Sequence, residues 1–178
     1  MIVNHTSVGS KAALPFQGIY NASKAALAML SETMRLELEG SFGVRVIDLK
    51  TAGVRTNIIE NNNVNRVKGG DAGGTNGGGG NGEGVLPEGS IYQPAREIVE
   101  KAMSQDGLRE RGISAQQWAD EVVPLLLGKN PPGVIWKGES ALIARIAVAV
   151  PGNLAEGVLK KMTGLDEVER VIKGARAS

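Results

Sequence analysis

Ser7, Tyr20 and Lys24 are the residues of this sequence whose types and spacing could carry out chemistry together. Tyr20 and Lys24 lie four residues apart in the segment YNASKAAL, and on a helix this spacing places both side chains on one face. A phenol is a poor proton donor and acceptor at neutral pH, but a nearby ammonium stabilises its phenolate form. Tyr20 could therefore act as a general acid/base, while the Ser7 hydroxyl hydrogen-bonds a substrate carbonyl oxygen.

The spacing alone does not decide in favour of catalysis. A Tyr and a Lys four apart on a helix also occur as a packed ring beside a solvated amine, and on spacing alone this structural alternative is favoured. The surrounding elements must therefore be considered, because they position the three side chains.

The first fifty residues predict a strand, a long helix and a second strand. Residues 1–6 form a short run that ends in polar side chains, as expected where a buried parallel strand opens into a site. From Ala26 to Leu38 apolar residues recur at intervals of three and four, and Gly40 is the predicted helix terminator. Residues 44–49 are a compact β-rich run. This order is the crossover unit of a doubly wound α/β fold.

The second half predicts further helices and one more strand. Ten of the seventeen residues from 68 to 84 are glycine, which predicts a disordered insertion rather than a phosphate-binding loop. Helices are predicted for Pro94 to Met103 and for Ser114 to Leu127, the latter interrupted or ended near Pro124. Residues 133–138 read as a strand, and residues 140–178 as a helical extension broken at Pro151-Gly152 and Thr163-Gly164.

Composition excludes several classes of function. A net charge of +1 without a basic stripe argues against nucleic-acid binding, so no nucleic-acid partner is expected. The sequence has no cysteine and a single histidine, so no metal site is expected. No secretory signal is visible, and the apolar run from Ala141 to Val150 is too short to span a bilayer. For this run, core packing is favoured over docking at a membrane surface.

The segments IVNHTSVGS, PFQGIYNASKAALAMLSETMRLEL and FGVRVIDL resemble the classical short-chain dehydrogenase/reductase family. The resemblance implies an incomplete Rossmann-like doubly wound parallel sheet with helices on both faces, read as a single truncated domain over 1–178. It implies Ser7, Tyr20 and Lys24 as catalytic residues, and it implies a set of cofactor-binding residues: Tyr20, Lys24, Gly53, Val54 and Thr56. The family's usual Pro-Gly after this strand is Ala52-Gly53 here.

The family's first strand, glycine-rich turn and helix, which receive the dinucleotide pyrophosphate, do not appear in this sequence. We therefore expect the N-terminal cofactor-binding segment to be missing, an exposed sheet edge, and weak NADPH binding by these 178 residues alone. The family's upstream catalytic Asn is absent as well. Asn4 is too close to Ser7 to replace it, so Asn4 and His5 are interpreted as structural residues that satisfy backbone groups at the strand end.

The later segments LPEGSIYQPAREIVEKAM and GVIWKGESALIARIAVAVP resemble the fungal NADPH-dependent 1-acyldihydroxyacetone-phosphate reductases. This resemblance implies NADPH (NADP) as cofactor and a lipid-like ketone as substrate. It also implies a role in lipid metabolism and a cytoplasmic location or a peripheral one on the endoplasmic reticulum or lipid droplets, while the resemblance to the wider family implies homo-oligomers. Two alternatives stay open: a dehydrogenase of a steroid, retinoid or other lipid alcohol, and a noncatalytic fragment that acts as an interaction module.

Overall fold

The computed structural model describes residues 1–57, 86–87, 89–104 and 110–177. Two compact units make up the chain, one comprising Met1–Arg55 with Leu108–Ala155 and the other Thr56–Gly107 with Glu156–Ser178. The predicted disordered insertion at 68–84 lies outside the described residues. The single domain over 1–178 stays a prediction.

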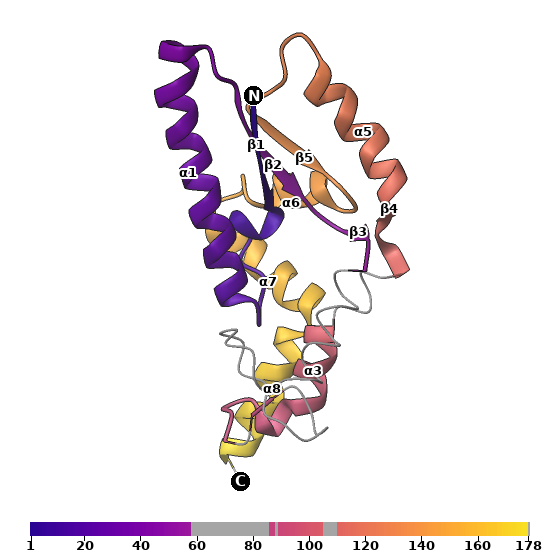
Figure 1. Ribbon diagram of the computed structural model, residues 1–178. Helices are drawn as coiled ribbons and strands as arrows, with labels where there is room; N and C mark the ends of the chain where they lie inside the picture. The colour runs from indigo at the N-terminus through magenta and orange to yellow at the C-terminus, as the bar shows by residue number, and fades with distance from the viewer. Residues whose placement is uncertain (58–85, 88, 105–109, 178) are drawn as a thin grey trace, which may run out of the picture. The chain divides into compact units, whose positions relative to one another are not determined.

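The first unit is built on a parallel sheet in the spatial order β1-β2-β5. Its strands are β1 (Ile2–Ser7), β2 (Val46–Thr51) and β5 (Val134–Lys137). Helix α1 (Gly18–Phe42) connects β1 to β2 on one face, and α5 (Ala115–Leu127) lies on the other face (Figure 1). The predicted α/β fold, with helices on both faces of a parallel sheet, is confirmed.

Strand β2 is buried on both faces, and its two faces differ in chemistry. Ile47 and Leu49 pack with Val122 of α5 and Ile135 of β5 into a hydrophobic cluster. The intervening Asp48 and Lys50 point to the opposite face, because successive side chains of a strand alternate, and both are buried. A strand that carries two charges into the interior needs polar partners there.

Helix α1 continues past the predicted terminator Gly40 and ends at Phe42, so that prediction is wrong. Gly43 is the residue that ends it, with a left-handed φ of 66° and its N–H donated to the Glu39 carbonyl at 3.1 Å. Left-handed backbone is what a helix C-terminus requires, and glycine adopts it without a Cβ penalty. Gly40 is accommodated as an ordinary helical residue.

Short elements complete the first unit. They are the 3-10 turn η1 (Val8–Ser10), the two-stranded parallel pair β3 (Val54–Arg55) and β4 (Ile113–Ser114), and helix α6 (Ala141–Ala147). The predicted helix from Ser114 to Leu127 is confirmed as α5, with the Ser114 side chain as its N-cap, but the predicted interruption near Pro124 is wrong, because the helix continues to Leu127. In α6 only Ala141 is buried, whereas Leu142, Ile143 and Ile146 are each more than half exposed. The favoured reading of this run as core packing is therefore wrong.

The second unit is helical in the residues described. It contains the 3-10 turn η2 (Gln93–Ala95), α3 (Arg96–Ser104), most of α7 (Gly152–Thr163) and α8 (Leu165–Ala177). The breaks predicted at Pro151-Gly152 and Thr163-Gly164 are confirmed, and Gly164 has a left-handed φ of 73°. Buried Ala95, Val99 and Val168 form its interior. Among the described helices, none combines the length and the apolar character that crossing a bilayer demands.

Candidate active site

Ser7 is the last residue of β1 and lies at the point where the strand passes into η1. Its side chain is buried, and its Oγ accepts a hydrogen bond from the Gly9 backbone N–H at 3.1 Å. The position of the hydroxyl is thus set by the 3-10 turn that follows it. The hydroxyl proton remains available to donate a hydrogen bond to a carbonyl oxygen.

Tyr20 and Lys24 lie in the first two turns of α1, on one face as predicted from their spacing. The Lys24 Nζ is 5.8 Å from the centroid of the Tyr20 ring and donates a hydrogen bond to the His5 carbonyl at 3.2 Å. Tyr20 is 43 % exposed, so its ring is not sealed inside the protein. The ammonium is therefore held between β1 and the Tyr20 ring.

Gly9 is where the serine and the tyrosine come together. A Cβ built on Gly9 would lie 3.4 Å from the Tyr20 Cε1 and only 2.8 Å from the Asn21 Oδ1, so the ring packs directly against the turn that holds Ser7. Asn21 is fixed in turn, because its Nδ2 donates to the Leu14 carbonyl at 2.9 Å. The structure thus brings Ser7, Tyr20 and Lys24 to one end of β1.

His5 and Asn4 have side-chain partners rather than the backbone partners expected from the sequence. The His5 ring is 2.6 Å from the Thr51 Oγ1 and stacks on Trp118 with the ring centroids 5.6 Å apart. Burial, followed by the charge of Lys24, holds the pKa of His5 below its ordinary value of 6.5. Asn4 donates to the Ser31 Oγ at 2.9 Å. Both residues therefore tie β1 to its neighbours.

The loop after β2 is held by backbone hydrogen bonds. Gly53 and Glu139 exchange two of them, at 3.3 and 2.9 Å, and the Gly53 carbonyl also accepts from the Ile113 N–H at 3.3 Å. Ala52 donates its N–H to the Lys137 carbonyl at 2.9 Å, a bond that a proline at this position could not make. Alanine in place of the usual proline therefore allows a backbone hydrogen bond to the end of β5. The loop is anchored to the end of β5.

The predicted cofactor residues of this loop differ in their placement. Gly53 and Val54 both lie in the first unit, where Val54 begins β3. The amide and carbonyl of Gly53 are already engaged, so this residue shapes the loop rather than presenting a free amide. Thr56 belongs to the second unit, and its part in cofactor binding stays a prediction.

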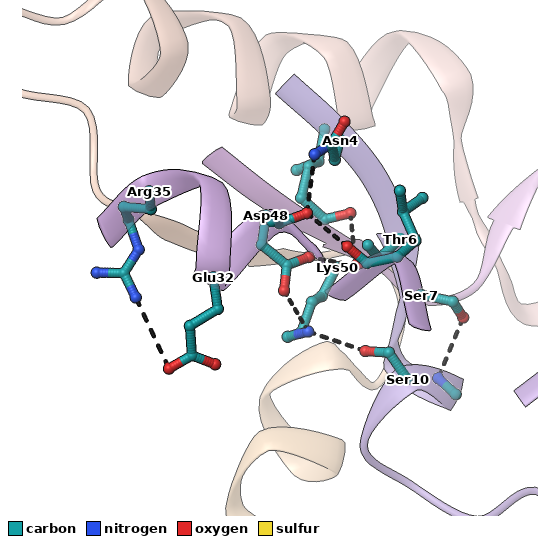
Figure 2. Close-up of polar contacts among 12 residues, drawn as sticks. Asn4, Thr6, Ser7, Ser10, Glu32, Arg35, Asp48 and Lys50 are labelled. Carbon is teal, nitrogen blue, oxygen red and sulfur yellow. Dashed lines mark hydrogen bonds and ion pairs between the residues drawn. The ribbon is translucent and has the colours of Figure 1, made fainter. Parts of the chain in front are cut away.

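A buried charged network on the α1 face of the sheet was not predicted from the sequence (Figure 2). The Lys50 ammonium lies 2.5 Å from the Asp48 carboxylate and donates to the Ser10 Oγ at 2.8 Å. The Thr6 hydroxyl donates to the same carboxylate. Alternating charges in VIDLK, an otherwise apolar strand segment, were the available signal, since buried charges require partners.

A cavity of about 390 Å³ adjoins this network. Its lining includes Ser10, Arg35, Asp48, Lys50 and Trp136, but none of Ser7, Tyr20 and Lys24. It is therefore separate from the candidate catalytic residues. Within the described ranges, no group of three His, Asp or Glu side chains is arranged to hold a metal ion.

Comparison with known proteins identifies the family. Residues 1–66 match the model of the short chain dehydrogenase family. The chain is 44% identical over 156 residues to a short-chain dehydrogenase/reductase of Pestalotiopsis microspora, covering 88% of this chain and 52% of that protein. The chain belongs to the short-chain dehydrogenase/reductase family.

Two further relatives of this family carry a more specific name. An NADPH-dependent 1-acyldihydroxyacetone phosphate reductase of Schizosaccharomyces pombe is 32% identical over 160 residues, covering 84% of this chain and 48% of that protein. The protein of the same name from Saccharomyces cerevisiae is 30% identical over 177 residues, covering 97% and 51%. The chain thus spans about half the length of the curated relatives it matches.

The donor set at the end of β1 suits one part of a nicotinamide dinucleotide. An accessible phenol and an ammonium side by side can both donate hydrogen bonds to ribose hydroxyls. The anchored Ala52–Val54 segment follows β2, at the carboxyl edge where short-chain dehydrogenases and other doubly wound proteins bind their ligands. Tyr20, Lys24 and this loop therefore fit the nicotinamide-ribose end of the cofactor.

Proposed function

We propose that this chain carries the catalytic half of an NADPH-dependent oxidoreductase that reduces a lipid-type ketone. The proposed reaction converts 1-acyldihydroxyacetone phosphate to 1-acylglycerol 3-phosphate. The observation that carries the proposal is that Ser7 and Tyr20 meet at Gly9, while the Lys24 ammonium lies between the His5 carbonyl and the partly exposed Tyr20 ring. The substrate is proposed from the two relatives named as acyldihydroxyacetone phosphate reductases.

Each of the three side chains has a role at the carbonyl group. The Ser7 hydroxyl donates a hydrogen bond to the carbonyl oxygen and polarises the C=O bond. Tyr20 transfers its phenolic proton to that oxygen as negative charge develops there, and Lys24 stabilises the resulting phenolate. NADPH, when bound, supplies the hydride that forms the new C–H bond, so the ketone becomes a secondary alcohol and NADP⁺ is released.

The test is NADPH oxidation by the purified protein, followed at 340 nm with and without 1-acyldihydroxyacetone phosphate. We expect substrate-dependent turnover that Tyr20→Phe abolishes, because the ring keeps its packing and loses only the hydroxyl group that would supply the proton. Tyr92→Phe, a ring in the second unit, is the matched control and should keep turnover. Turnover by Tyr20→Phe at the wild-type rate would refute the assignment, whereas oxidation only with steroid or retinoid ketones would redirect the substrate. Binding of no nicotinamide cofactor would favour an interaction module.

We further propose that the protein contacts the surface of the endoplasmic reticulum or of lipid droplets through α6. The support is the exposure of Leu142, Ile143 and Ile146 on this short helix, with Arg145 between them for anionic headgroups. Flotation with liposomes should recover the wild-type protein, and Leu142→Ser with Ile146→Ser should reduce recovery. Equal recovery of the two proteins would refute this role. Homo-oligomerisation stays a prediction, for which light scattering is the measurement.

A further inference from the structure

The buried pair Asp48–Lys50 is bonded to the chain on both sides of Ser7. Thr6, directly before the serine, donates its hydroxyl to the Asp48 carboxylate. Ser10, three residues after the serine, accepts from the Lys50 ammonium at 2.8 Å. Figure 2 shows the two charged side chains from β2 reaching these two positions.

The second of these bonds bears on the catalytic hydroxyl through one intermediate. Ser10 is the last residue of η1, and Gly9 in the same turn donates its N–H to the Ser7 Oγ. Fixing Ser10 therefore fixes the Gly9 amide, which in turn orients the serine hydroxyl. The first bond fixes the backbone that enters the turn, where Thr6 lies opposite Lys50 in the strand register.

The location of the charges argues that they are not an incidental surface pair. The side chains of Lys50 and Asp48 are only 3 % and 9 % exposed, and removing two charges from water is expensive. Such a pair is weak evidence for stability, because apolar replacements of similar size are often as stable. The charges on the buried strand β2 are therefore better explained by a role in fixing the positions of the residues that they contact.

We propose that Asp48 and Lys50 are positioning residues that hold the Ser7 hydroxyl at the substrate carbonyl by fixing Thr6 and Ser10. The inference rests on the proposed function, in which Ser7 is the group that contacts the carbonyl oxygen. Neither Asp48 nor Lys50 touches the substrate. Their effect is to restrict the range of positions that Ser7 samples, and misplacement of a catalytic group by about 1 Å can reduce rates on the order of a hundredfold.

The decisive variant is the double replacement Asp48→Leu with Lys50→Met. It removes both bonds to the chain around Ser7 without leaving an unpaired charge, so the fold is expected to persist. The Thr6 hydroxyl keeps an acceptor, since the Leu49 carbonyl is 3.4 Å away. We expect unfolding midpoints close to wild type, a kcat lowered on the order of tenfold or more, and a KM that changes much less.

The matched control is Ser31→Ala, which removes a partly buried hydrogen bond to Asn4, a residue of β1 that contacts neither Thr6 nor Ser10 through this bond. It should keep the wild-type kcat. A stable double variant with the wild-type kcat would overturn the proposal, because a merely structural pair would leave turnover intact. If the double variant fails to fold, Thr6→Val with Ser10→Ala takes its place, and an unchanged kcat there would overturn the proposal equally.

One further arm separates this inference from the function on which it rests. Ser7→Ala should reduce kcat at least as far as the double variant. If Ser7→Ala turns over at the wild-type rate, the proposed role of Ser7 is wrong and the positioning role falls with it. If Ser7→Ala is impaired while the double variant that folds is fully active, only the positioning role is wrong.

Discussion

Replacing Gly9 by alanine tests the packing that brings the candidate site together. The added Cβ would lie 2.8 Å from the Asn21 Oδ1, well inside van der Waals contact, and 3.4 Å from the Tyr20 ring. Asn21 cannot move freely, because its Nδ2 holds the Leu14 carbonyl at 2.9 Å. Overpacking of this kind costs about 1–3 kcal/mol. We expect Gly9→Ala to lower the free energy of unfolding by that amount and to reduce turnover, since Asn21, the residue next to Tyr20, must move away from the turn.

Urea unfolding followed by tryptophan fluorescence is a suitable assay. Both tryptophans of the chain, Trp118 and Trp136, lie in the first unit, so the signal reports on the unit that contains Gly9. Gly40→Ala is the matched control, because Gly40 lies inside α1 with nothing within 4 Å of an added Cβ. It should raise stability by about 0.5–1 kcal/mol. If Gly9→Ala is as stable as Gly40→Ala, Gly9 is not tightly packed against Asn21 and Tyr20, and the prediction is refuted.

The remaining predictions concern a charge, a titration and a cap. Lys50→Met alone should lower the free energy of unfolding by about 3–5 kcal/mol, because it leaves the Asp48 carboxylate buried without its counter-charge, whereas the double variant with Asp48→Leu should unfold near the wild-type midpoint. Since the pKa of His5 is lowered in the folded state, its contribution to stability should be complete above pH 6.5 and decline as the pH falls below it. His5→Gln should therefore make the melting temperature depend less on pH below 6.5. The same pH dependence of the melting temperature in the variant and the wild type would argue against this role of His5. Ser114→Ala should cost about 1 kcal/mol by removing the side-chain cap of α5, and Thr33→Ala, which breaks only a hydrogen bond within α1, should cost less in the same urea titration.

Elements with a strong local signal were predictable from the sequence. The strand-helix-strand order of the first fifty residues, the later helices and the strand at 133–138 all appear in the structure, because hydrophobic periodicity reflects which faces are buried. The end of α1 was misplaced by choosing Gly40 over Gly43. Both are glycines after an apolar run, and only the left-handed backbone at Gly43 distinguishes them.

The exposure of α6 and the hydrogen bonds of the loop after β2 could not be predicted in the same way. The apolar run from 141 to 150 looked like core, yet in α6 only Ala141 is buried, since composition does not say whether a partner surface is near. The sequence shows Ala52-Gly53 in place of the family's usual Pro-Gly without showing what the Ala52 amide contacts. In the structure the Ala52 amide donates a hydrogen bond to Lys137, far away in sequence.

The sequence by itself pointed to the three candidate catalytic residues through its resemblance to a known family, and it determined the parallel α/β framework because the strand-helix-strand order is a local property of the chain. The tertiary structure alone decided how Ser7 is held. Gly9 has to meet the Tyr20 ring, and Thr6 and Ser10 have to meet a buried ion pair from β2 that lies some forty residues away in sequence. Contacts between residues so distant depend on how the strands align, which spacing along the chain does not encode.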